Sequence, residues 1–147
     1  MTVYELPAET KAATGYTHKA TVDHADLTET TANTAQSITL LSLAAGDVVH
    51  SGAYKLVTPF QDSADAAFNT TAVTLNAAGS TLMSATETNV NGTEVFYKAH
   101  TATAPLAVNT GTSTVAASFA AMSAKNLAAL NAGEVHFYFS VNKLAGL

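Results

Sequence analysis

The chain has no cysteine, no tryptophan and no arginine, and only 12% of its residues are charged. The lack of cysteine excludes disulfides, thiolate zinc sites and cysteine nucleophiles. Six lysines stand against 11 acidic residues, which gives a formal net charge of -5. Because affinity for nucleic acid depends on clustered lysine and arginine, nucleic acid is not expected as a partner.

Long apolar runs are also missing. The most apolar stretches, Ile38 to Leu43 and Val135 to Val141, have the length of strands, whereas a membrane-spanning helix needs about 20 apolar residues. Residues 1–7 hold no basic segment followed by an apolar run, so no secretory signal is expected. The sequence therefore predicts a soluble protein without a membrane partner, used as translated.

What the chain does have is enough apolar material for one core. Its 147 residues are 48% hydrophobic, and about one residue in six is threonine, a composition that fits a single domain with a hydroxyl-rich surface. Residues 1–14 contain Pro7 and show no sustained apolar period, which predicts an extended N-terminal arm that is free to reach a neighbour. Residues 15–147 are expected to form the domain itself.

Short β-type runs separated by Gly and Asn turns follow the arm. Strands are expected at residues 16–22, 37–43, 48–58, 70–75, 80–88, 93–100, 112–119 and 135–142. The runs at 37–43 and 48–58 are expected to pair across the turn at 44–47, and Asn91-Gly92 is expected to form another turn. Pro105 makes residues 101–109 an edge or a loop. Residues 59–69 predict an ordered loop or one helical turn held by Phe60 and Phe68.

The clearest element is the last strand. Apolar residues from Val135 to Val141 alternate with His136, Tyr138 and Ser140, which predicts one buried and one exposed face. One short helix is expected over residues 123–131, with Ser123 as its N-cap. This pattern predicts an all-β fold, an antiparallel β-sandwich or jelly roll with an extended arm and at most one short helix.

Enzyme signatures are missing from the sequence. It holds no Gly-x-Ser-x-Gly, no His-Glu-x-x-His, no phosphate loop and no calcium loop, so neither an enzymatic activity nor a cofactor is predicted. His18 and His24 would lie about 20 Å apart on one strand, too far to share a metal. Asp62 and Asp65 could offer oxygens to a hard cation, but turns use the same residues, and no metal site is predicted. A hydrolase with an unrecognised site is a minor alternative.

The aromatic residues raise the question of sugar binding, because aromatic rings on a flat sheet can stack on sugars. Without tryptophan, and with the six phenylalanines expected in the core, only tyrosines are left for such a surface. The candidates are Tyr4, Tyr16, Tyr54, Tyr97 and Tyr138.

Three segments carry a resemblance to a known class of proteins. They are Asp47 to Phe60 (DVVHSGAYKLVTPF) with its continuation to Asn69, Asn91 to Ala99 (NGTEVFYKA), and Leu130 to Phe139 (LNAGEVHFYF). Over about residues 26–142 the chain resembles small structural proteins of tailed bacteriophages. In those proteins the run after the first strand pair closes with a Gly-Asp-Gly-Gly-like turn, and this chain departs from that pattern with Asn76-Ala77-Ala78-Gly79.

The resemblance implies a virion component without a catalytic site, a capsid decoration or cement protein on the surface of the phage head. It implies synthesis in the host cytoplasm, the major capsid protein as partner, and a homo-oligomer, with a trimer favoured. The residues expected to contact the partner are Thr2, Val3, Tyr4 and Leu6 of the arm together with Tyr54, His136 and Tyr138. The alternative is a receptor- or glycan-binding module of a phage tail or head fibre, with Tyr54, His136 and Tyr138 as contacts.

Overall fold

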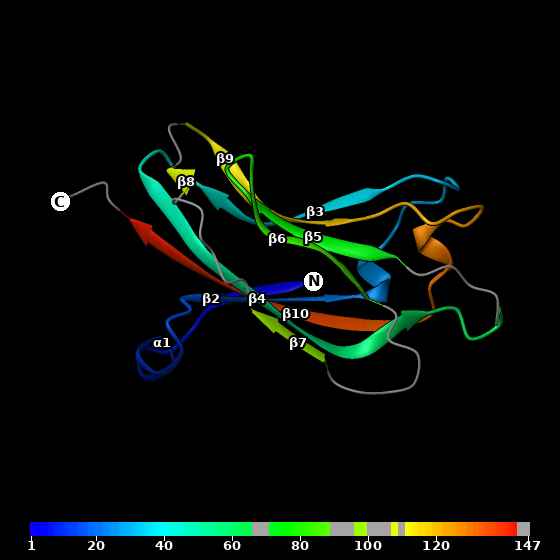
Figure 1. Ribbon diagram of the computed structural model, residues 1–147, viewed down its shortest axis with the longest axis horizontal. Helices are drawn as coiled ribbons and strands as arrows, with labels where there is room; N and C mark the ends of the chain where they lie inside the picture. Colours follow the sequence, from blue (N-terminus) through cyan, green and yellow to red (C-terminus); the bar gives the residue numbers. More distant parts are fainter. Residues whose placement is uncertain (66–70, 89–95, 100–106, 109–110, 144–147) are drawn as a thin grey trace.

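The computed structural model describes residues 1–65, 71–88, 96–99, 107–108 and 111–143, with only the backbone at residues 87, 96–99 and 107–108. Two antiparallel sheets pack face to face (Figure 1), which confirms the predicted all-β sandwich. The elements are β1 (Thr2–Glu5), α1 (Ala8–Thr14), β2 (His18–Asp23), the 3-10 helix η1 (His24–Asp26), β3 (Gln36–Leu43), β4 (Asp47–Gln61), β5 (Ala72–Ala77), β6 (Ser80–Glu87), β7 (Phe96–Ala99), β8 (Ala107–Val108), β9 (Ser113–Phe119), the 3-10 helix η2 (Leu127–Ala129) and β10 (Ala132–Lys143).

One sheet has the strand order β1-β2-β10-β4-β7, with β8 also paired to β4, and the other has the order β3-β9-β5-β6. The long strands β4 and β10 pair along most of their length and form the centre of the six-stranded sheet. The hairpin from β5 to β6 turns at Ala78 and Gly79, which have φ values of 48° and 77°. Such positive φ values at both central residues are typical of the tightest hairpins.

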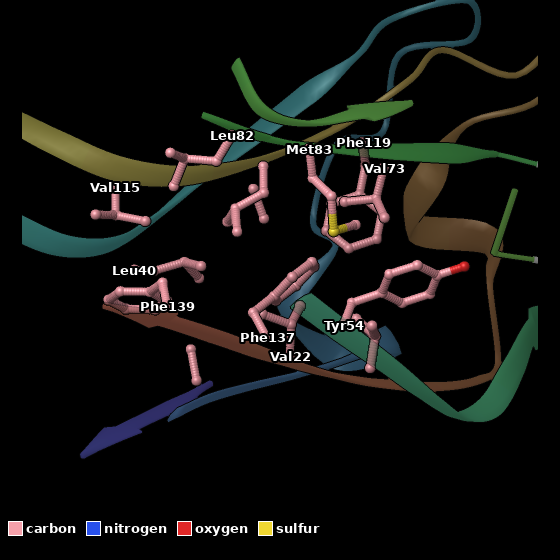
Figure 2. Close-up of a cluster of buried hydrophobic side chains, with 14 of the residues drawn as sticks. Val22, Leu40, Tyr54, Val73, Leu82, Met83, Val115, Phe119, Phe137 and Phe139 are labelled. Carbon is pink, nitrogen blue, oxygen red and sulfur yellow. The ribbon is translucent and has the colours of Figure 1, made fainter. Parts of the chain in front are cut away.

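The core lies between the two sheets, where inward residues of both layers meet. Val135, Phe137 and Phe139 of β10 are 0% exposed, as the alternation in the sequence predicts. Figure 2 shows the Phe137 ring pointing from β10 toward Val73 and Phe119 of the opposite sheet. Burial of each such ring contributes about 1.5–3 kcal/mol relative to exposure.

The predicted pairing of residues 37–43 with 48–58 is wrong, because β3 and β4 belong to different sheets. The backbone of Asp47 donates to the Ala44 carbonyl, and the Asp47 carboxylate accepts the Ala44 amide hydrogen at 2.8 Å. This closed turn carries the chain from one layer to the other. Leu40 and Val49 can therefore both be buried while they enter the core from opposite sides.

The predicted helix at residues 123–131 is also wrong, because this stretch forms only the single 3-10 turn η2. Two of its amides bond to the segment at residues 29–33, and those of Lys125, Ala129 and Leu130 bond to the carbonyl three residues earlier. Ala124 N–H donates to Asn33 Oδ1 at 2.8 Å, and Ala128 N–H donates to the Glu29 carbonyl at 3.0 Å. Tertiary hydrogen bonds thus replace the local ladder that a helix needs.

Residues 1–14 do not form the predicted extended arm. Strand β1 pairs with β2 of the same chain, from Thr2 opposite Thr21 to Glu5 opposite His18, and α1 follows. The helix begins after Pro7 and ends at Gly15, which has φ 76°, and a proline at the start with a glycine beyond the end is the usual punctuation of a helix. That signal was present in the sequence.

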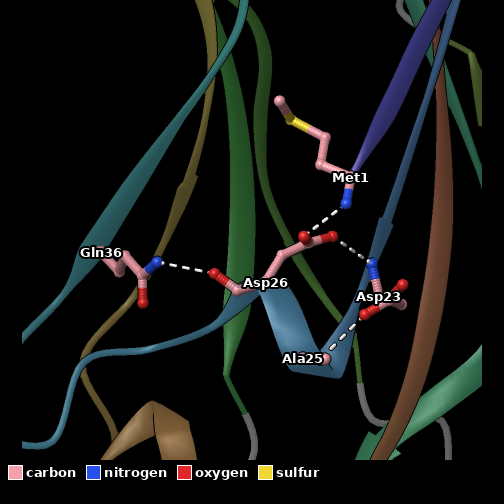
Figure 3. A network of polar contacts seen from close by, with 5 residues as sticks. All are labelled: Met1, Asp23, Ala25, Asp26 and Gln36. Carbon is pink, nitrogen blue, oxygen red and sulfur yellow. Dashed lines mark hydrogen bonds and ion pairs between the residues drawn. The ribbon is translucent and has the colours of Figure 1, made fainter.

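A polar network holds the first residues against η1 (Figure 3). The Met1 ammonium forms an ion pair with the Asp26 carboxylate, whose other oxygen accepts the Asp23 amide hydrogen at 3.0 Å. The Asp23 carboxylate in turn accepts the Ala25 amide hydrogen at 2.8 Å. These reciprocal bonds form a capping box and fix the corner at which β2 leaves the sheet.

The stretch predicted as a loop from residue 59 begins as strand, because β4 runs to Gln61 and buries Phe60. The expected anchor Phe68 and the expected Asn91-Gly92 turn lie outside the described residues.

Candidate functional site

The residues predicted to contact a partner lie in different environments. Thr2 and Tyr4 are exposed on β1, whereas Val3 packs against the core and Leu6 is buried. Tyr54 is only 1% exposed, so its predicted role as a surface contact is corrected. It lies opposite Phe137 on the inward face of the sheet, and this burial raises the pKa of Tyr54 to about 12.

The outward face of the six-stranded sheet gathers the remaining candidates. The strand register places Tyr4 opposite Lys19, Lys19 opposite Tyr138, and Tyr138 opposite Ala53. One row of side chains therefore crosses β1, β2, β10 and β4 on the face that points away from the core. We call the group formed by Tyr16, Lys19, Ala53 and Tyr138 the outer platform.

Aromatic rings surround the lysine of the outer platform. Lys19 Nζ lies 5.8 Å from the centroid of the Tyr4 ring and 6.0 Å from that of the Tyr138 ring, within the range of cation–π attraction. The Tyr16 and Tyr138 rings are tilted by 48° with centroids 6.1 Å apart. Within the part of the chain that the structure describes, no carboxylate forms an ion pair with Lys19.

The chain segment before β2 closes one end of the outer platform. The Ser140 hydroxyl donates to the Gly15 carbonyl, which holds Gly15 and the adjacent Tyr16 over the sheet. Ser140 is 0% exposed as a result. The four residues of the platform are half-buried, and the segment before β2 lies at one end of them.

Polar residues occupy the next rows along β10. His136 lies opposite Thr21 and Lys55, and His136 Nε2 is 2.6 Å from Glu134 Oε1. Glu134 and Asp23, which face each other across the ladder, line a shallow open cleft of about 480 Å³ that also includes His24. Among the residues with described side chains, no cluster of histidine and acidic residues is arranged to hold a metal ion.

The other predicted candidates have structural roles. His18 is half-buried and packs its ring on that of Phe139. Asp62 Oδ1 accepts the Ala64 amide hydrogen at 2.9 Å, and Asp65 forms an ion pair with Lys125. The Asp62 contact is the turn chemistry that the sequence offered as the alternative to a cation site, whereas the Asp65 contact joins two distant parts of the chain.

Lys19 was not among the residues predicted to bind a partner, and Tyr16 was named only among the tyrosines considered for a sugar-binding surface. The signal that could have identified Lys19 is its position between His18 and Ala20, because Ala20 and Val22 supply the apolar half of an alternating strand. Tyr54 and Leu56 are two residues apart on one strand, so their side chains lie on the same face. The apolar Leu56 indicates that this face points inward.

Comparison of the chain with protein-family models, with curated proteins and with solved structures finds no match. Within the described residues, no helix has both the length and the apolar character to cross a membrane.

Proposed function

We propose that this chain is a non-enzymatic structural protein of a tailed-phage virion, a decoration protein that binds the outer surface of the capsid and bridges its subunits. The strand-and-turn pattern of residues 47–69, 91–99 and 130–139 supports this function through its resemblance to small phage structural proteins. The proposed partner is the major capsid protein, and the proposed assembly is a homo-oligomer, a trimer by analogy with such proteins.

The structural observation that carries this proposal is the character of strand β1. The large hydrophobic side chains that the described residues leave exposed are Met1, at 48%, and Tyr4, at 44%, and both belong to this edge of the sheet. In the described part of the chain, β1 pairs only with β2, so its outer backbone edge is open. An open edge with apolar side chains is suited to accept a strand from a partner protein.

This surface gives the segment of residues 1–14 a different role from that of a free arm. The segment presents its edge while it stays docked on β2, so a capsid strand would extend the six-stranded sheet. Many copies bound at symmetry-related positions would each add a modest contact, and their sum would raise the barrier to separation of the capsid subunits.

The test is co-sedimentation of the purified protein with phage heads that lack it, followed by heating of the bare and the reloaded heads. We expect saturable binding and a higher melting temperature of the reloaded heads. Tyr4→Ser should lower the affinity at least tenfold, and Thr39→Ala on the opposite sheet should bind like the parent chain. Deletion of residues 1–14 should abolish binding while the β domain stays folded by circular dichroism. Failure to bind any shell would eliminate this function.

A second candidate is a receptor- or glycan-binding module of a phage tail or head fibre. The observation that favours it is the pair of half-buried rings at Tyr16 and Tyr138 on the outward face of the sheet, since sugars stack on aromatic rings at a protein surface. His136, on the same face of β10, could contribute a polar contact, whereas the burial of Tyr54 removes it from this candidate. Binding to a glycan array would distinguish this candidate from a decoration protein, which should show none.

A further inference from the structure

Strand β10 is hydrogen-bonded on both sides, to β2 and to β4. A ligand over its outward face therefore finds few free backbone groups and must be held by side chains. This separates the outer platform from the open edge of β1, where a peptide could add as a strand. Because β10 offers few free backbone groups, the platform suits a compact ligand better than an extended peptide.

The surface beside Tyr138 is shaped by its neighbours. On the β4 side its cross-strand partner is Ala53, whose side chain is a single methyl group. Tyr16 stands on the same face with its ring tilted toward that of Tyr138, and the bond from Ser140 to Gly15 fixes the segment that carries it. We call the half-buried rings of Tyr16 and Tyr138, with the small side chain of Ala53 beside them, the shelf. Aromatic rings on a sheet surface can stack on the apolar face of a sugar ring.

In the row of described side chains that crosses Tyr138, the charged residue is the cation Lys19, although the chain as a whole has a net charge of -5. Lys19 lies on the β2 side of Tyr138, and its Nζ is near the rings of both Tyr4 and Tyr138. Two acidic residues of this face, Glu134 and Asp23, lie two rows from Tyr138 in the register, and Glu134 contacts His136.

We infer that the outer platform binds a saccharide unit that carries a carboxylate. The sugar ring lies on the shelf at Tyr138, and Lys19 donates to the carboxylate, a charge-assisted hydrogen bond of the stronger kind. The inference rests on the second candidate function and specifies its ligand class. The decoration function uses the β1 edge and does not depend on it.

The test measures binding by calorimetry with two matched pairs of probes. The acidic probes are trigalacturonic acid and 3′-sialyllactose, and their neutral counterparts are the methyl ester of trigalacturonic acid and lactose. We expect the acidic member of at least one pair to bind at least tenfold more tightly than its neutral counterpart. Its affinity should fall as the salt concentration rises, because salt screens the contact with Lys19.

Two variants and a control connect the binding to the platform. Lys19→Gln should reduce binding of the acidic probe at least tenfold and leave the weak binding of the neutral probe unchanged. Tyr138→Ser should reduce binding of both, and Lys143→Gln, which removes a lysine at the exposed end of β10, should change neither. Circular dichroism of each variant confirms that it is folded.

The outcomes separate the inference from the functions proposed above. Equal binding of acidic and neutral probes would overturn the proposed role of the carboxylate. The second candidate function, a glycan-binding module, would then still stand. No binding of any of the four probes would overturn the inference, and binding of poly-glutamate alone would overturn it in favour of an acidic peptide ligand. Tyr138→Ser should still bind phage heads, so a failure on the platform is distinct from a failure of the decoration function.

Discussion

The imidazole ring of His18 stacks on the phenyl ring of Phe139 across the ladder between β2 and β10, with centroids 5.4 Å apart and planes within 2° of parallel. The His18 Nδ1 atom lies 2.7 Å from the Thr17 hydroxyl. Burial lowers the pKa of His18, and the positive charges of Lys11 and Lys143 act in the same direction, while the facing Glu5 opposes them. The folded sheet therefore favours the neutral imidazole.

This contact predicts a pH-dependent stability. Below the ordinary pKa of 6.5 the unfolded chain binds a proton at His18 more readily than the folded chain, so stability is full above pH 6.5 and falls as the pH drops below it. Thermal unfolding between pH 8 and pH 5 should show a smaller decrease in melting temperature for His18→Gln than for the parent chain. If the melting temperatures of the two proteins decreased equally between pH 8 and pH 5, the pH dependence would not come from His18.

A second prediction concerns Gly133 at the start of β10. A Cβ at this position would lie 2.4 Å from Cδ1 of Phe60, and the φ of +145° is one that other residues rarely adopt. Gly133→Ala should therefore lower the free energy of unfolding by at least about 2 kcal/mol, through overpacking and backbone strain. Gly111→Ala, where the added Cβ meets no atom within 4 Å, should change it by less than about 0.5 kcal/mol. Urea denaturation measures both.

A third prediction concerns Gln36, which links β3 to the segment after η1. Its Oε1 accepts the amide hydrogens of Thr28 and Glu29 at 2.8 and 2.9 Å, and its Nε2 donates to the Asp26 carbonyl at 2.9 Å. Gln36→Ala removes all three bonds and should lower the free energy of unfolding by about 1–2 kcal/mol.

The control for Gln36→Ala is Gln61→Ala, because Gln61 is exposed at the end of β4. This variant should be within about 0.5 kcal/mol of the parent chain. Hydrogen exchange at the Thr28 and Glu29 amides should be faster in Gln36→Ala than in the control. Unchanged exchange would show that the amide side chain does not hold this segment.

A fourth prediction tests the two faces of β10 with adjacent residues. Phe137 is 0% exposed between the sheets, whereas Tyr138 is on the outward face. Phe137→Ala should lower the free energy of unfolding by about 3–5 kcal/mol. Tyr138→Ser should lower it by much less. Chemical denaturation compares the two variants, and equal losses of stability would contradict the assigned faces.

The sequence by itself determined the β-sandwich class, most of the strands and the buried face of β10. Strict alternation from Val135 to Val141 sets which side chains face the core, because successive residues of a strand point to opposite sides. The same rule places Lys19 outward, because it alternates with the apolar Ala20 and Val22, and places Tyr54 inward, on the same face as Leu56. The resemblance to phage structural proteins also came from the sequence and is still a prediction.

Only the tertiary structure decided how these elements combine. The sequence suggests a turn at residues 44–47, but a turn can return a strand to its own sheet or carry it to the opposite one, and the pairing of β3 with β9 decides between them. The stretch before β10 has helical residues, yet the amides of Ala124 and Ala128 bond to Asn33 and Glu29 instead of to helical carbonyls. Likewise, the row that joins Tyr4, Lys19 and Tyr138 exists only through strand register. These contacts join residues far apart in the chain, so local pattern contains no information about them.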